Sequence, residues 1–172
     1  MLHCLRNRVQ GGTSIFVDAF HSAQKLSTQS FDILSRTPVP YHYINDGHHL
    51  HHSHPIISLS RFHRRVEHIN YSPPFQAPLP IDTPDEFYSA LEEFVGLLDN
   101  KKHRFEHTLR EGEAVVFDNR RILHARTEFH EVEQTLNGAT SRWLKGCYLE
   151  ADDILDLHRR LNTETMSNCL SN

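Results

Sequence analysis

Apolar and polar residues alternate with a period of two over many short stretches of the chain, a pattern typical of β-strands that expose one face. Glycine, proline and charged residues separate these stretches from one another. The predicted strands lie at 2–9, 13–17, 39–44, 56–59, 66–71, 104–109, 114–117, 122–124 and 142–149. Gly11 and Gly12 stand between the first two and predict a tight turn or bulge.

One segment has the 3.6-residue period of an amphipathic helix instead. The apolar residues of its buried face are Phe87, Leu91, Phe94, Val95 and Leu98. Thr83 as N-cap, with Glu86 three residues later, forms the pattern of a capping box. Shorter helices are predicted over 19–26, with Asp18 as N-cap, and over 152–161.

Two segments predict loops. Residues 71–80 include four prolines, which remove backbone donors and exclude a central strand or helix. Residues 48–54 carry five histidines and are expected at the tip of a hairpin. Strands that flank one long helix predict a β-rich α+β protein with barrel or jelly-roll architecture and flanking helices. We expect one domain over 1–162 and a polar tail over 163–172.

The composition argues against several classes of protein. No apolar run approaches the roughly 20 residues that a membrane span requires, and the first ten residues lack the apolar core of a signal peptide. The net charge is −4, and Lys and Arg are scattered, so a nucleic-acid partner is not indicated. Three widely spaced cysteines among 172 residues favour a reducing compartment, the cytoplasm, over a disulfide framework.

Two polar side chains in the C-terminal part suggest a chemistry. His124 and Arg142 each lie in a short apolar strand pattern. A neutral imidazole can hold a metal ion, and a guanidinium fork can clamp a carboxylate. An oxygen-activating iron site also uses a second histidine and a carboxylate, often in an H-x-D or H-x-E sequence. No histidine of this chain is followed two positions later by Asp or Glu.

Three segments resemble the C-terminal part of the TauD/TfdA-like 2-oxoglutarate, iron(II)-dependent dioxygenases. They read Gly-Gly-Thr-Ser at 11–14, Phe-Asp-Asn-Arg-Arg-Ile-Leu-His-Ala-Arg at 117–126 and Arg-Trp-Leu-Lys-Gly-Cys-Tyr at 142–148. The resemblance extends over about residues 2–161. Within the superfamily the chain is most similar to the carnitine-pathway branch, the gamma-butyrobetaine and trimethyllysine dioxygenases. This resemblance implies a partial double-stranded β-helix.

The resemblance also implies roles for five residues. His124 is the expected distal iron ligand, Arg142 the partner of the C5 carboxylate of 2-oxoglutarate, and Ser14 a hydroxyl near that carboxylate. Tyr148 is expected in an aromatic cage around a trimethylammonium group, where cation–π attraction replaces hydrogen bonds. Ser72 is expected to take over a substrate contact that asparagines make in relatives. Two alternatives stay open: Ser14 finishes a turn, and Tyr148 packs in the core.

By the same resemblance, the complete enzyme uses Fe(2+), 2-oxoglutarate as cosubstrate and ascorbate. It hydroxylates a small trimethylammonium substrate, with gamma-butyrobetaine ranked ahead of trimethyllysine. Because the H-x-D ligands are missing, we expect this chain to be a truncated form that is inactive alone. We expect the protein to form homodimers, without nucleic-acid or membrane partners, in the cytoplasm or, at full length, in mitochondria.

Two other interpretations predict different behaviour. The chain could be a non-catalytic degenerate barrel that serves as a binding module. It could also buffer metal ions through the histidines of 48–54, in which case zinc or nickel affinity survives His124→Ala and disappears when those histidines are replaced.

Overall fold

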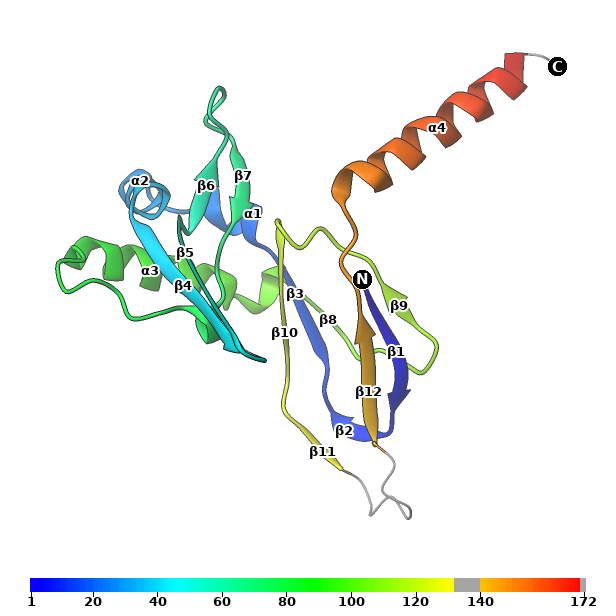
Figure 1. Cartoon of the computed structure of the whole chain (residues 1–172), viewed down its shortest axis with the longest axis horizontal. Helices are drawn as coiled ribbons and strands as arrows, with labels where there is room; N and C mark the ends of the chain where they lie inside the picture. Colours follow the sequence, from blue (N-terminus) through cyan, green and yellow to red (C-terminus); the bar gives the residue numbers. More distant parts are fainter. Residues whose placement is uncertain (132–139, 171–172) are drawn as a thin grey trace. The chain divides into compact units, whose positions relative to one another are not determined.

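The computed structural model describes residues 1–131 and 140–170, with the side chains of the last helix described up to residue 163. The chain forms two compact units, and each unit is made of segments that are separated in the sequence (Figure 1). Unit 1 comprises Met1–Gln10, Leu109–Phe117 and His130–Asn172. Unit 2 comprises Gly11–Thr108 and Asp118–Phe129. Since these units do not divide the chain near residue 162, the expected domain boundary there stays a prediction.

A three-stranded antiparallel sheet organises unit 2. Strand β3 (Ser14–Asp18) lies between β8 (Arg104–His107) and β10 (Ile122–Arg126). Val17 is buried in the hydrophobic core, and Ile15 packs against this core. Because side chains alternate across a strand, the remaining residues of β3 face the other side of the sheet.

Three helices contribute to the core of unit 2: α1 (Ala19–Ala23), α2 (Thr28–Arg36) and α3 (Asp85–Leu98). Asp18 caps α1, as predicted, by accepting hydrogen bonds from two backbone N–H groups. The amphipathic helix is also confirmed, although its predicted capping box is wrong. Pro84 occupies the N-cap position, and the Thr83 hydroxyl donates to the Pro80 carbonyl at 2.7 Å instead of capping the helix.

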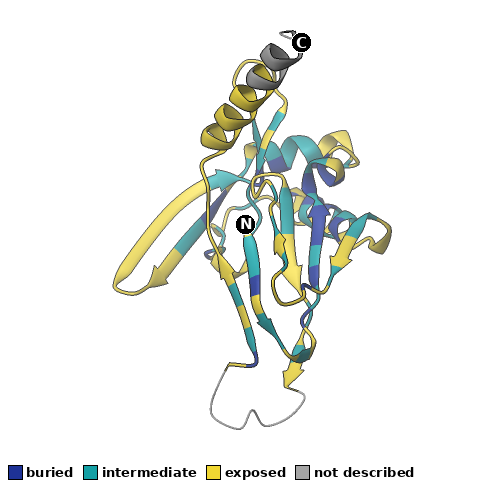
Figure 2. Ribbon diagram, turned by 90° about the vertical axis from the view of Figure 1, so that its right-hand side faces the viewer, coloured by how far each residue is buried: buried dark blue, intermediate teal, exposed yellow. Residues whose placement is uncertain are grey.

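The histidine-rich segment is not a loop, so this prediction is wrong. It forms strand β5 (His48–Pro55), which pairs along its whole length with β4 (Pro38–Asn45). The turn between them is Asp46-Gly47, with φ angles of 52° and 77°, and an Asp-Gly pair favours this kind of tight turn. Backbone hydrogen bonds hold such a ladder without apolar side chains, and most of this hairpin is exposed (Figure 2).

A second hairpin follows, formed by β6 (Ile57–Leu59) and β7 (Val66–Ile69). The proline-rich segment is irregular apart from a short 3-10 helix, η1 (Pro73–Phe75), as its composition predicts. A further 3-10 helix, η2 (Lys101–His103), connects α3 to β8. The predicted hairpin with the histidines at its tip is therefore replaced by two separate hairpins.

Unit 1 contains a sheet in which β1 (Leu2–Asn7) lies between β9 (Ala114–Val115) and β12 (Arg142–Gly146). Helix α4 (Ala151–Leu170) is longer than the predicted 152–161 and continues into the segment expected as a polar tail. Its residues are exposed throughout the part whose side chains are described.

The short strands β2 (Val9–Gly11) and β11 (Phe129–Glu131) pair where the chain passes from one unit to the other. Gly11 and Gly12 both adopt positive φ, so the predicted backbone irregularity at this point is confirmed. The protein is strand-rich with helices, as expected, while the partial double-stranded β-helix (jelly-roll) arrangement stays a prediction. Among the described residues, none of the helices combines the length and apolarity needed to cross a membrane.

Candidate functional site

The candidate site is the face of the β10–β3–β8 sheet that points away from the core of unit 2. His124 lies opposite Phe16, and Phe16 lies opposite Phe105. Directly opposed residues of an antiparallel ladder share a face, so these three side chains form one row. The rings of Phe16 and Phe105 are 6.3 Å apart between centroids. The imidazole therefore stands at the end of an aromatic row.

A second row runs parallel to the first, two residues further along each strand. It contains Arg126, Ser14 and His107 in that order across the strands. Because the two rows are two residues apart, Ser14 and His124 lie on the same face of one sheet. Two residues predicted from separate sequence segments, 11–14 and 117–126, are thus brought together by strand pairing.

The pKa of His124 departs from the ordinary value of a histidine. The partial removal of its imidazole from water lowers the pKa below the ordinary histidine value. This favours the neutral imidazole at pH 7, which is the form that coordinates a metal. The residue as a whole is exposed. A ligand could therefore reach it from this side of unit 2 when that unit is considered by itself.

Ser14 is buried, with only 5% of its surface exposed, and is paired on both sides within β3. Ser14 is the first residue of β3, just after the positive-φ residues Gly11 and Gly12, and its role toward a cosubstrate stays a prediction. Three threonines fix the start of the strand beside it. The Thr127 hydroxyl accepts from the Thr13 N–H at 3.0 Å, and the hydroxyls of Thr13 and Thr108 are 2.7 Å apart.

An ion pair fixes the entry to β10. The Arg121 guanidinium donates through Nε to both carboxylate oxygens of Asp18, at 3.1 Å each. These hydrogen bonds are the main reason that the pKa of Asp18 is held below its ordinary value. The Asp118 carboxylate accepts from the Arg120 N–H at 2.9 Å, which confirms Asp118 as a residue of the turn before β10. Nothing in the sequence patterns indicated the Arg121–Asp18 pair.

Arg142 and Tyr148 belong to unit 1. Arg142 begins β12 opposite Asn7 of β1 and is half-buried. Its charge acts on the buried thiol of Cys4, although burial outweighs it and raises the pKa of that thiol. Tyr148 is 88% exposed, so the alternative that it packs in the core is wrong. The convergence of Arg142 and Tyr148 with His124 stays a prediction.

Ser72 lies in unit 2 immediately before η1. It is half-buried, and its carbonyl accepts from the Phe75 N–H at 3.0 Å. The hydrogen bond places Ser72 in the turn that starts the 3-10 helix, outside the two rows of the sheet face. The structure thus brings Ser14 and His124 onto one face but assigns Ser72 only this local role.

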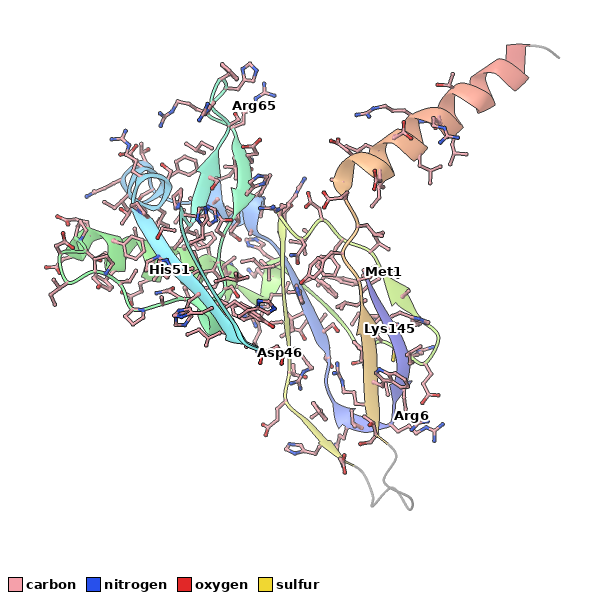
Figure 3. All side chains as sticks on the ribbon, in the orientation of Figure 1. Met1, Arg6, Asp46, His51, Arg65 and Lys145 are labelled. Carbon is pink, nitrogen blue, oxygen red and sulfur yellow. The ribbon has the colours of Figure 1, made fainter. Side chains whose placement is uncertain are left out.

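The histidines of β5 lie on both sides of the β4–β5 hairpin, on which Figure 3 labels His51 and Asp46. The rings of His52 and His54 are 4.1 Å apart between centroids. Burial is the main reason that the pKa of His54 is lowered, and repulsion from His52 adds to it. Across the described ranges, no set of three or more His, Cys, Asp or Glu side chains is arranged to hold a metal ion. This finding includes both the hairpin and the surroundings of His124.

Strand alternation could have identified, before the structure was known, which residues of each strand share a face. Phe105 and His107 are separated by one residue in a predicted strand, and so are Ser14 and Phe16. What the sequence could not supply was the register. The structure shows that β3 is the central strand, and this determines which residues flank the imidazole.

Comparisons with known proteins identify the relatives of this chain. The family model described as "Taurine catabolism dioxygenase TauD, TfdA family" matches residues 1–148. Among curated proteins, Dioxygenase str8 of Strobilurus tenacellus is 53% identical over 93% of this chain and 39% of its own length. Gamma-butyrobetaine dioxygenase of Homo sapiens is 34% identical over 83% of this chain and 40% of its own. Trimethyllysine dioxygenase, mitochondrial, of Bos taurus is 26% identical over 95% of this chain and 39% of its own length.

Solved structures show a similar fold. An asparagine oxygenase in complex with Fe(II), 2S,3S-3-hydroxyasparagine and succinate aligns with a TM-score of 0.60 at 24% identity, over 83% of this chain and 42% of that one. A taurine dioxygenase from Burkholderia xenovorans aligns with a TM-score of 0.61 at 17% identity, over 83% of this chain and 48% of that one. The chain spans about 40% of the length of the curated relatives it matches. With its family model matched over residues 1–148, the chain belongs to the TauD, TfdA dioxygenase family.

Proposed function

We propose that this chain supplies the C-terminal part of an iron(II)- and 2-oxoglutarate-dependent dioxygenase site, with His124 as one iron ligand. The observation that carries the proposal is the shared sheet face of His124 and Ser14, on which the imidazole is biased toward its neutral form. Family membership supports the same assignment. Arg142 is the proposed partner of the C5 carboxylate of 2-oxoglutarate.

The described residues fit such a metal only in part. His124 provides one nitrogen ligand, whereas an iron site of this type needs a second histidine and a carboxylate. The described residues contain no three-ligand group, and the sequence contains no H-x-D or H-x-E. We therefore propose that the other ligands come from a segment outside these 172 residues, and that the chain has little or no turnover alone.

When bound, the iron supplies the oxidation chemistry, and the residues of this chain position the reactants. The Ser14 hydroxyl is proposed to donate a hydrogen bond to a carboxylate oxygen of 2-oxoglutarate. Phe16 lies opposite His124 on the neighbouring strand, with Phe105 beyond it, and burial of the imidazole lowers its pKa and so favours its neutral form. The Asp18–Arg121 ion pair fixes the start of β10 and hence the position of His124.

The proposed substrate is a small trimethylammonium compound, with gamma-butyrobetaine ahead of trimethyllysine. The 34% identity to gamma-butyrobetaine dioxygenase compared with 26% to trimethyllysine dioxygenase supports this order. Tyr148 offers an exposed ring for cation–π contact, and Ser72 is the proposed contact of the substrate carboxylate. We further propose ascorbate as a reductant, a homodimer, and a cytoplasmic location with mitochondria as the alternative.

The test is a metal and activity measurement on the chain joined to an upstream segment that carries an H-x-D or H-x-E sequence. We expect iron binding and succinate release from 2-oxoglutarate, both lost in His124→Ala. His158→Ala is the matched control, because His158 is an exposed histidine of α4 that bonds only within that helix among described contacts. Product identification with gamma-butyrobetaine and with trimethyllysine separates the two substrates.

Two results would contradict the proposal. Equal iron content in the His124→Ala and His158→Ala proteins would remove His124 from the metal site. Succinate release at a native rate by the 172 residues alone would contradict the proposed division of ligands between segments.

A second function is favoured by the same shortage of ligands: a non-catalytic binding module that keeps the fold. This interpretation predicts that the joined protein still binds 2-oxoglutarate or the substrate without consuming oxygen. It also predicts that His124→Ala leaves this binding unchanged. Oxygen consumption that depends on 2-oxoglutarate would exclude it.

A further inference from the structure

A basic pocket lies between the end of α2 and the β6–β7 hairpin of unit 2. It is a cavity of about 350 Å³ that is open to solvent. Three arginines and three serines from separate segments line it, together with two apolar residues and no carboxylate. The polar lining residues are Ser35, Arg36, Ser58, Ser60, Arg61 and Arg64.

The charge of the pocket is strongly positive. Arg36 pairs with Asp32 one helical turn earlier at 2.7 Å, with both side chains largely exposed. Within the described ranges, neither Arg61 nor Arg64 forms an ion pair. Helix α2 ends at Arg36, and its C-terminal carbonyls contribute about half a negative charge there. With the Arg36 charge balanced by Asp32, the Arg61 and Arg64 guanidinium groups still outweigh this half charge, so the pocket favours an anion.

Two of the serine hydroxyls already accept a hydrogen bond within the protein. Ser58 Oγ accepts from Asn70 Nδ2 at 2.9 Å, and Ser60 Oγ accepts from the Arg65 N–H at 3.2 Å. Because these bonds use only a lone pair of each oxygen, each hydroxyl keeps its own hydrogen as a donor for a ligand. Ser35 differs, because its hydroxyl donates to the Asp32 carbonyl at 2.9 Å.

The turn that carries the arginines is held in a defined and unusual conformation. Arg64 adopts φ 49°, in the left-handed region that non-glycine residues seldom occupy. Two backbone hydrogen bonds close the turn: Ser60 N–H to the Arg65 carbonyl at 2.8 Å, and Arg64 N–H to the Ser60 carbonyl at 3.1 Å. Such strain persists where surrounding contacts fix it, and it concentrates at ligand sites. Arg64 lines the pocket, whereas Arg65, which Figure 3 labels near the end of the β6–β7 hairpin, is not one of its lining residues.

We propose that this pocket binds the phosphate group of a small phosphorylated molecule. Arginine forks match the spacing of phosphate oxygens and bind them in pairs, and serine hydroxyls complete a tetrahedral acceptor set. A cavity of about 350 Å³ exceeds the volume of inorganic phosphate, so it has room for part of an attached organic group. The pocket shares no residue with the sheet face of His124, so this proposal is independent of the proposed iron site.

The test is a calorimetric titration of the full chain with inorganic phosphate and with O-phosphoserine in chloride buffer. The double variant Arg61→Met/Arg64→Met is expected to bind each probe at least about tenfold more weakly, since a charged hydrogen bond is removed at each position. Arg65→Met is the matched control. It removes the same charge from the same turn but not from the pocket lining, and it is expected to change affinity less than about twofold.

A second variant covers the case in which the double variant fails to fold. Arg61→Lys/Arg64→Lys keeps both charges and removes only the forks, and we expect it to weaken phosphate binding as well. Equal losses in Arg65→Met and in the double variant would overturn the proposal in favour of diffuse charge. The proposal would also be overturned if neither inorganic phosphate nor O-phosphoserine binds. This holds even if phosphatidylserine vesicles bind to the chain through the exposed Phe62.

Discussion

Replacing Asp18 should weaken unit 2 in two separable ways. The Asp18 carboxylate caps α1 by accepting from the N–H groups of Phe20 and His21, at 3.1 Å and 3.2 Å. The same carboxylate pairs with Arg121 at the start of β10. Asp18→Ala removes both contacts, whereas Asp18→Asn keeps an equally good N-cap and removes only the charge.

The magnitudes follow from burial and geometry. Loss of an N-cap costs about 1 kcal/mol. The ion pair has two Nε contacts but is partly exposed, with 32% of the Asp18 and 50% of the Arg121 side chain accessible, so about 0.5–1 kcal/mol is a suitable value. We therefore expect a loss in unfolding free energy of about 2 kcal/mol for Asp18→Ala and at most about 1 kcal/mol for Asp18→Asn.

The pH dependence has a defined sign. Because hydrogen bonds from Arg121 lower the pKa of Asp18 in the folded state, its ionised form stabilises the fold at every pH above the unfolded value of about 3.9. This stabilisation is lost as the pH falls through the folded pKa. The difference between wild type and Asp18→Asn should therefore be constant near pH 7 and shrink below about pH 4.

The assay combines urea unfolding with hydrogen exchange of the Phe20 and His21 amides, which report on unit 2. The single tryptophan, Trp143, lies in unit 1, so its fluorescence is an internal control. A double-mutant cycle with Arg121→Met isolates the ion pair. The reasoning is refuted if Asp18→Asn costs as much as Asp18→Ala, or if the cycle gives a coupling energy near zero.

Three further predictions concern packing, backbone and thiol chemistry. Phe94→Ala should destabilise the protein by about 3–5 kcal/mol in urea unfolding, because Phe94 is fully buried. Gly11→Ala should be destabilising by more than about 1 kcal/mol, since Gly11 has φ 88° and a Cβ there would clash with the Glu128 carbonyl oxygen. Gly96→Ala, where a Cβ would meet open space, should stabilise α3 by about 0.5–1 kcal/mol, and urea unfolding measures both changes. Maleimide labelling followed by mass mapping should modify exposed Cys147 well before Cys4, whose thiol pKa burial raises; faster labelling of Cys4 would refute this.

Local signals in the sequence were sufficient where one residue type has one dominant structural use. The apolar spacing in 84–98 predicted α3, and Asp18 before an apolar segment predicted the cap of α1. The same reasoning failed for the capping box at Thr83. A threonine hydroxyl can bond to a nearby turn carbonyl as well as to a helix N–H, and the proline-rich approach to α3 favoured the turn.

Periodicity also failed for β5, where histidines replace the usual apolar residues of a strand. The Asp46-Gly47 pair was the available signal for a tight hairpin, and it was outweighed by the polar composition around it. Backbone pairing with β4 needs no apolar side chain, and the ladder stabilises the strand despite exposure of most of its residues.

The sequence by itself determined the type of most elements, the segments at 11–14, 117–126 and 142–148 that resemble the family, and His124 as the candidate ligand. Only the tertiary structure decided that β3 is the central strand and that His124 and Ser14 share a face. It also decided that Arg36, Arg61 and Arg64 meet at one pocket. The physical reason is that periodicity sets the direction of a side chain within its own element, whereas register and packing between distant segments depend on contacts that local sequence does not encode.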